Sequence, residues 1–142
     1  MRLGRRLNRD QKSELIRRAP LFARVSKSDI REIAKLADEI DLREGKEMTR
    51  QGLPGREFFV LLEGSADVRK NGRRINTLGP GDFFGEIALV SRAPRTATVT
   101  ATSPVRALVI TDRAFRRLLD ESPQVKTRVM EAMAQRLAPE ML

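Results

Sequence analysis

The 142-residue chain predicts an α+β fold that is mainly β, an antiparallel β roll or jelly roll flanked by N-terminal and C-terminal helices. Apolar residues recur at helical spacing only towards the two ends of the chain. Between Ile40 and Ile110, turn residues recur at short intervals, which is typical of short antiparallel strands. The length fits one hydrophobic core. We therefore expect a basic flexible arm over residues 1–9 and a single domain over residues 10–142.

Two helices are expected within residues 10–39. Asp10 can cap the first, which carries Leu15 and Ile16 on one side and ends before Pro20. Residues 28–37 form the second, because their apolar side chains fall at positions i, i+3, i+4 and i+7. An apolar elbow, Ala19-Pro20-Leu21-Phe22, lies between the two helices.

The roll is expected over residues 40–110, and Asn71-Gly72 is its clearest turn signal. This pair readily adopts the positive φ angles of a two-residue type I′ hairpin turn. Four further glycines of this region, at positions 45, 55, 64 and 79, are also interpreted as turn residues. The predicted strands are Glu57–Glu63, Ser65–Lys70, Arg73–Leu78, Thr96–Ala101 and Val105–Ile110.

Helical spacing returns over residues 111–138. Thr111 or Asp112 can cap one helix, and Ser122-Pro123 begins another, because the missing N–H of proline has no helical partner at a first position. We expect this last helix to end before Pro139. One of its faces carries Val125, Val129, Met133 and Leu137, and this apolar stripe is interpreted first as core and second as a lid or a dimer seam.

Composition excludes several kinds of chemistry. The chain has no cysteine and no histidine, so it offers no disulfide, no Cys or His metal ligand and no Ser-His-Asp triad. We therefore expect no catalytic residues and no metal site. The acidic run from Asp38 to Glu47 lacks the spacing of a calcium loop and is interpreted as a solvated face.

Charge indicates an anionic partner without identifying it. The 28 Lys and Arg against 19 Asp and Glu give a net charge of +9, which suits nucleic acid, an anionic membrane or a small anionic ligand. The longest apolar run, Phe58 to Leu62, is far shorter than the about 20 residues that cross a bilayer. No apolar stretch follows the basic N-terminus as in a signal peptide, so a cytoplasmic location is expected.

The segment from Gly79 to Val99 carries the clearest chemistry. Its glycines fit neither a Walker loop nor a dinucleotide fingerprint. Gly85 allows another group to approach the backbone, and residues 86–90 can form a helical turn with free N–H groups. Arg95 can grip two phosphate oxygens, and Glu86 can accept a hydrogen bond from a sugar hydroxyl. These residues together predict a ligand with a phosphate beside a sugar.

Two motifs in this segment, Phe84-Gly85-Glu86-Ile87-Ala88-Leu89 and Pro94-Arg95-Thr96-Ala97-Thr98-Val99, resemble the phosphate-binding cassette of cyclic nucleotide-binding domains. This family is represented by the sensor domains of the catabolite activator protein, protein kinase A regulatory subunits and cyclic nucleotide-gated channels. The resemblance extends from about Asp10 to Leu137. It implies that Glu86 receives the ribose 2′-hydroxyl and that Arg95 pairs with the cyclic phosphate.

The resemblance also assigns the neighbouring positions. Gly85, Ile87 and Ala88 correspond to backbone positions near phosphate or ribose, and Ala97 offers its N–H to phosphate. Thr96 can bond the phosphate or the amino group of a syn guanine. The residues expected to cover the base come from the last helix, with the exact one left open among Val129, Met130 and Met133.

The function that we expect is a non-enzymatic cyclic nucleotide receptor without a cofactor, whose ligand is cAMP, with cGMP also binding. Ligand binding would close the last helix and pass a signal to an unknown effector protein or domain. Only a few residues follow Leu137, so a helix-turn-helix and direct DNA binding are not expected. The alternative is a basic nucleic-acid-binding protein built on the same roll, forming a homodimer through the last helix.

Overall fold

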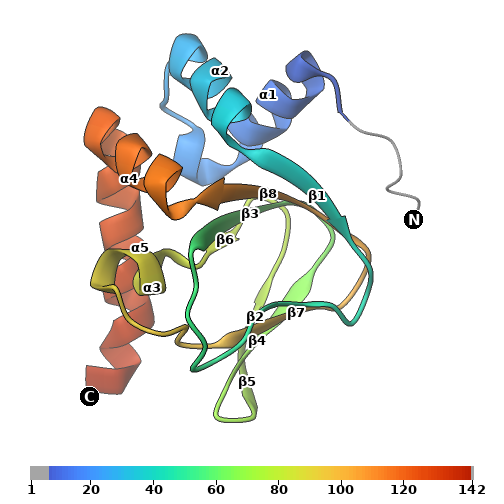
Figure 1. Ribbon diagram of the computed structural model, residues 1–142, viewed down its shortest axis with the longest axis vertical. Coiled ribbons are helices and arrows are strands. Elements are labelled where there is room, and N and C mark those ends of the chain that lie inside the picture. The colour runs from blue at the N-terminus through green and yellow to red at the C-terminus, as the bar shows by residue number, and fades with distance from the viewer. Residues whose placement is uncertain (1–6, 142) are drawn as a thin grey trace.

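A computed structural model describes residues 7–141, and its centre is a roll of two four-stranded antiparallel sheets (Figure 1). One sheet has the strand order β1-β8-β3-β6, and the other has the order β2-β7-β4-β5. The strands are β1 Asp38–Leu42, β2 Glu47–Thr49, β3 Glu57–Glu63, β4 Ala66–Lys70, β5 Arg73–Leu78, β6 Phe83–Phe84, β7 Thr98–Ala101 and β8 Val105–Thr111.

Helices from both ends of the chain pack beside the roll. The helical elements are α1 Arg9–Arg18, the short 3-10 helix η1 Pro20–Phe22, α2 Lys27–Leu36, α3 Glu86–Ser91, α4 Asp112–Glu121 and α5 Pro123–Met141. Figure 1 shows α1 and α2 beyond the β1-β8-β3 face of the roll, with α4 and α5 along its side. The predicted fold class, a mainly β roll flanked by helices, is confirmed.

The strands pair in a nested order. β4 pairs with β5, β3 with β6, β2 with β7 and β1 with β8, all antiparallel. These four nested pairs form a long antiparallel ribbon. Further pairings of β3 with β8 and of β4 with β7 join the ribbon into the two sheets. The innermost pair is the predicted hairpin, with positive φ angles of 53° at Asn71 and 79° at Gly72.

Strand β3 is buried on both sides because it separates two apolar cores. Phe58 faces the helices, where its ring stacks on Phe115 at a centroid distance of 4.7 Å. Phe59 faces the interior of the roll, where it stacks on Phe84 at 4.8 Å. Burying a phenylalanine side chain completely stabilises the folded state by roughly 1.5–3 kcal/mol relative to leaving it exposed. The two cores thus fix the roll to its helices and the cassette strand β6 to the roll.

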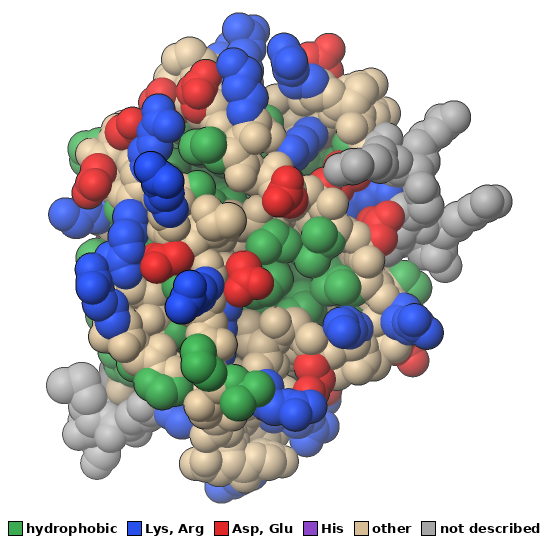
Figure 2. Space-filling model, in the orientation of Figure 1, with side chains coloured by type: hydrophobic (Ala, Val, Ile, Leu, Met, Phe, Trp, Pro, Cys, Tyr) green, Lys and Arg blue, Asp and Glu red, His purple; other side chains and the backbone are tan. Residues whose placement is uncertain are grey.

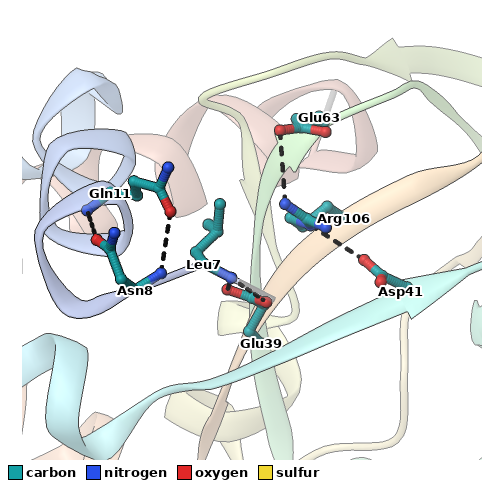
Figure 3. A network of polar contacts seen from close by, with 7 residues as sticks. All are labelled: Leu7, Asn8, Gln11, Glu39, Asp41, Glu63 and Arg106. Carbon is teal, nitrogen blue, oxygen red and sulfur yellow. Dashed lines mark hydrogen bonds and ion pairs between the residues drawn. The ribbon is translucent and has the colours of Figure 1, made fainter. Parts of the chain in front are cut away.

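The N-terminal helices begin at residues other than those expected. Asn8, not Asp10, caps α1: its Oδ1 accepts from the Gln11 N–H at 2.8 Å, while Gln11 Oε1 accepts from the Asn8 N–H at 3.0 Å (Figure 3). This reciprocal capping box satisfies two free donors, and a cap within the helix at Asp10 could not. Ser26 likewise caps α2, which therefore begins at Lys27. Of the expected arm, residues 1–6 lie outside the described residues.

The acidic strand β1 is more than a solvated face. Asp41 Oδ1 accepts a 3.1 Å hydrogen bond from Nε of Arg106, which is only 4% exposed, and Glu63 lies 3.9 Å from the same guanidinium (Figure 3). Glu39 accepts from the Leu7 N–H at 3.1 Å. A buried arginine needs partners of opposite charge, so this part of the acidic run is structural.

At the C-terminal end, Thr111 caps α4 as one of the two predicted candidates, and Pro123 begins α5 as expected. Helix α5 continues through Pro139 to Met141, so the expected end before this proline is wrong. A proline removes one backbone donor, and here that loss does not stop the helix. Strand β7 begins at Thr98 rather than Thr96, because residues 95–97 belong to the loop of the cassette.

Candidate functional site

A cavity of about 820 Å³ lies between the cassette, strands β4 and β5, the η1 elbow and helix α5. All seven cassette residues that the sequence singled out line it, although they come from two separate motifs: Gly85, Glu86, Ile87, Ala88, Arg95, Thr96 and Ala97. The structure thus brings the two halves of the predicted cassette together around one space. Its size is that of a small-molecule site.

Gly85 makes the sharp connection between β6 and α3. Its φ of +97° lies in the left-handed region that favours glycine. A Cβ at this position would also lie 2.8 Å from the Glu57 carbonyl oxygen and 2.9 Å from Arg95 Nη1. The absence of a side chain therefore allows the cassette backbone to approach both β3 and the arginine.

Arg95 is a buried cation at the wall of the cavity, with 6% of its surface exposed. Its guanidinium donates to the carbonyl oxygens of Glu57 at 2.8 Å and Gly85 at 3.2 Å, and the Glu57 carboxylate lies 3.9 Å away. Burial lowers the pKa of Arg95 from its ordinary value, while the charges of Glu57 and Glu86 act to raise it. A desolvated cation held mainly by neutral carbonyls suits an incoming anion.

Glu86 is almost completely buried, at 1% exposure, at the start of α3. Its carboxylate is bound by Arg136 of α5, whose Nη1 donates to both oxygens, with 2.7 Å to Oε2. The same guanidinium donates from Nη2 to the Phe83 carbonyl oxygen at 2.6 Å and lies over the Phe83 ring. The cassette acid and the last helix are therefore directly joined.

Sequence reasoning missed Arg136. It lies 50 residues from Glu86, and within α5 it looks like any polar residue beside an apolar stripe. No local spacing signals a partner this distant. Only the packing of α5 against the cassette brings the pair together.

The three residues expected to cover the base, Val129, Met130 and Met133, lie away from the cavity lining. Val129 is fully buried in the core beside the helices, Met133 packs against that core, and Met130 is 39% exposed. The residues of α5 that line the cavity are Arg128, Ala132, Gln135, Arg136 and Leu137. Because neighbouring helical residues differ by about 100° in direction, Val125, Val129 and Met133 of the apolar stripe face the core, while the cavity lies along the adjacent face of α5. Leu137, the last residue of the stripe, lines the cavity.

Two further features of the described residues bear on the site. Over residues 7–141, no group of three or more histidine, cysteine, aspartate or glutamate side chains is arranged to hold a metal ion. Within the same range, none of the helices is both long and apolar enough to cross a bilayer.

Comparison with known proteins identifies the family. The model of the cyclic nucleotide-binding domain family matches residues 39–122. This range contains the whole cassette and all the strands listed above, except for Asp38 at the start of β1. The chain belongs to this family. It is a cyclic nucleotide-binding regulatory domain of the kind found in kinase regulatory subunits and CRP-like regulators.

Two curated relatives illustrate the range of this family. The chain is 42% identical over 112 residues to a cAMP-dependent protein kinase regulatory subunit of Mycosarcoma maydis, covering 70% of this chain and 21% of that protein. It is 27% identical over 129 residues to a CRP-like cAMP-activated global transcriptional regulator of Mycobacterium tuberculosis H37Rv, covering 87% and 58%. The chain thus spans about a fifth to three-fifths of these relatives.

Solved structures agree with this assignment. The cAMP-bound structure of PfPKA-R, residues 141–441, matches with a TM-score of 0.83 and 25% identity over 94% of this chain and 48% of that one. The Sp-2Cl-cAMPS-bound structure of PKAR CBD2 matches with a TM-score of 0.82 and 25% identity, covering 94% and 92%.

Proposed function

We propose that this chain is a non-enzymatic receptor for cAMP, formed as one domain over residues 10–142, that passes ligand binding to a partner protein through α5. One observation carries the proposal: a buried arginine and a buried glutamate from the two cassette motifs line the same cavity. A cyclic phosphodiester carries a single negative charge, which one arginine can balance. A nucleoside triphosphate would need more cations and a metal ion.

Each cassette residue has a role in the proposed complex. Arg95 pairs with the cyclic phosphate, to which Ala97 also donates its backbone N–H. Glu86 accepts from the ribose 2′-hydroxyl, while Gly85, Ile87 and Ala88 border phosphate and ribose. Thr96, half-buried at the cavity wall, bonds the phosphate that both nucleotides share, so both cAMP and cGMP bind. The preferred ligand is cAMP, the nucleotide for which the relatives of this chain are named.

The link between Glu86 and Arg136 supports a response in α5. Arg136 is positioned by its ion pair with the Glu86 carboxylate. A ribose hydroxyl that donates to Glu86 shares this carboxylate and so changes the contact that positions Arg136. The residues of α5 that line the cavity, with Leu137 as the apolar one near its end, then close over the ligand. The related regulatory proteins are known by kinase or transcriptional roles, and the effector of this chain is proposed to be a protein or domain bound through the moved helix.

Isothermal titration calorimetry against cAMP, cGMP and 5′-AMP tests the proposal. We expect binding of both cyclic nucleotides, tighter for cAMP, and little binding of AMP, whose phosphate carries a second charge that one arginine does not balance. Absence of heat with either cyclic nucleotide, in a protein shown to be folded, contradicts the proposed function.

The variant Arg95→Ala should weaken cAMP binding by about 2–5 kcal/mol, the usual cost of removing one partner of a buried charged contact. The exposed Arg74 on β5 offers the matched control, and Arg74→Ala should leave affinity unchanged. Affinity within about threefold of the original protein for Arg95→Ala, with unchanged melting, would show that Arg95 does not pair with the phosphate.

A further inference from the structure

We infer that Gly55, in the loop between β2 and β3, is a positioning residue for Arg95. The sequence assigns this glycine to a turn, as it does Gly79. The structure places it directly against the arginine side chain, 40 positions away in the chain. The inference rests on the proposed function, since it concerns how the phosphate-binding group is held.

A side chain at residue 55 and the guanidinium of Arg95 would occupy the same space. A Cβ built on Gly55 would lie 2.6 Å from Arg95 Cδ and still closer to Nε and Cζ. Real Cβ atoms essentially never approach other heavy atoms this closely. Gly55 is not among the glycines with positive φ, so backbone freedom does not explain the glycine. The contact with Arg95 does.

The loop that carries Gly55 is tied to the backbone of Arg95. The Arg95 N–H donates to the Leu53 carbonyl oxygen, and the Gly52 N–H donates to the Arg95 carbonyl oxygen, both at 2.9 Å. Because the loop and the backbone of Arg95 are joined in this way, a methyl group on residue 55 cannot easily move away from the side chain. The guanidinium must move instead.

A second glycine, Gly85, also lies against the guanidinium of Arg95. A Cβ at Gly85 would lie 2.9 Å from Arg95 Nη1, so the cassette also leaves space for this side chain. Displacement by a methyl at residue 55 would break the hydrogen bonds from Arg95 to the carbonyl oxygens of Glu57 and Gly85. The protein would still fold, but the Arg95 guanidinium would no longer lie where it can bind the phosphate.

The test compares Gly55→Ala with Gly79→Ala. Gly79 is the matched control, because it also lacks a positive φ and a Cβ built there meets nothing within 4 Å. We expect cAMP affinity to fall about tenfold in Gly55→Ala, which displaces rather than removes the arginine, and to stay within about twofold in Gly79→Ala. In an Arg95→Ala background, Gly55→Ala should have no further effect, since its target is gone. Unchanged affinity in Gly55→Ala, or additive losses in the double variant, would overturn the inference.

A ligand-independent measurement separates this inference from the proposed function. The Nε–Hε NMR signal of Arg95, assigned by its loss in Arg95→Ala, should shift in Gly55→Ala and stay in place in Gly79→Ala. An unmoved signal in Gly55→Ala rejects the positioning role even if no cyclic nucleotide binds. Should Gly55→Ala fail to fold, the double variant with Arg95→Ala should fold again, and its failure would place the clash elsewhere.

Discussion

Arg95 and Glu86, the two buried charged residues of the pocket, differ in the partners that hold them. Arg95 donates to neutral carbonyl oxygens, whereas Glu86 is bound by the charged guanidinium of Arg136. An anion that bonds Arg95 directly therefore adds a closer counter-charge than the Glu57 carboxylate, which lies 3.9 Å away. A hydroxyl that reaches Glu86 shares a carboxylate that already has a cationic partner. The contribution of Glu86 to binding should accordingly be the smaller of the two.

For Glu86→Ala we expect cAMP binding to weaken by about 1.5–3 kcal/mol, the range for a hydrogen bond with one charged partner. The ligand 2′-deoxy-cAMP, which lacks the hydroxyl, should lose much less affinity in the variant. Titration of both ligands against both proteins gives a double-mutant cycle, in which the effect of removing the Arg136 ion pair cancels. Zero coupling energy between Glu86 and the 2′-hydroxyl would reject the ribose role.

At this scale the sequence predicted the residues whose spacing is local and missed those whose partners are distant. The two cassette motifs are each continuous, so all seven residues could be selected before the cavity that they line was visible. Arg136 and Gly55 depend on contacts with Glu86 and Arg95, which only the folded chain brings close. Gly55 and Gly79 look alike as turn glycines, and only their surroundings differ.

Helix α5 is the element in which core and pocket functions meet. Val125 and Val129 have no exposed surface and belong to the core beside the helices. Arg128 donates to the Pro20 carbonyl oxygen at 3.2 Å, and Arg136 reaches Glu86 and the Phe83 carbonyl oxygen. Val125 and Val129 thus stabilise the fold, while Arg136 and Leu137 near the end of α5 cover the cavity.

Removing residues 134–142 should therefore separate the two functions. This deletion keeps Val125, Val129 and Met133 but removes Arg136 and Leu137 from the cavity wall. We expect the shortened protein to remain folded and to bind cAMP more weakly, by about 1–2 kcal/mol, because the apolar cover of Leu137 and the ion pair of Arg136 are both absent. Circular dichroism and calorimetry check the two parts. Full affinity in the shortened protein would exclude the end of α5, from residue 134 onward, as the closing element.

The boundaries of the elements show what a single sequence can and cannot indicate. Helix starts depend on which of several neighbouring polar residues makes the capping bond. Asp10 was expected as the cap of the first helix, where Asn8 serves, and the second helix was expected to begin at Ser28, whereas Ser26 caps it and it begins at Lys27. The end of α5 was placed before Pro139 because a proline usually stops a helix. The interiors of β3 and α4 were predicted well, because burial on one or both faces determines their pattern. Strand β5 is exposed except at Leu78, and it was predicted from the Asn71-Gly72 turn that precedes it.

At the scale of the whole molecule, the net charge of +9 raised nucleic acid as the alternative partner. On the face drawn in Figure 2, however, basic and acidic side chains are interspersed rather than separated into a basic stripe. Several arginines also form ion pairs with carboxylates of the same chain, such as Arg106 with Asp41 and Arg117 with Glu121. Charge that is balanced locally contributes less to a long-range attraction for a polyanion.

Salt dependence distinguishes the two partners. Affinity for cAMP should change by less than about tenfold between 50 and 200 mM salt, because a single buried phosphate contact is involved. Binding to a nucleic acid through six to ten phosphates would lose about 10³–10⁵ in affinity over the same range. Titrations of cAMP and of a duplex oligonucleotide at both concentrations provide the measurement. Tight duplex binding with a steep slope, combined with no cAMP binding, would favour the alternative.

The turn pattern predicted a region of short antiparallel strands, and the closed roll followed from their even spacing. The sequence did not reveal which strands pair across the roll, because pairing partners such as β1 and β8 are separated by the whole roll. Their alternation of buried and exposed residues is compatible with several neighbours. The nested order is a property of the complete chain.

That nested order has a consequence for the kinetics of folding. The β4–β5 hairpin closes the shortest loop, and each further pair encloses the one before, so loop-closure entropy favours pairing from the hairpin outward.

Gly72 and Gly45 offer a matched test, since both have positive φ, and a Cβ at either meets nothing within 4 Å. Each Gly→Ala change should cost about 1–2 kcal/mol of backbone strain. Stopped-flow refolding should show Gly72→Ala mainly slowing folding and Gly45→Ala mainly accelerating unfolding, whereas identical effects would argue against this order. Because the cassette lies between β6 and β7, the chain would complete its ligand pocket only after the inner half of the ribbon has formed.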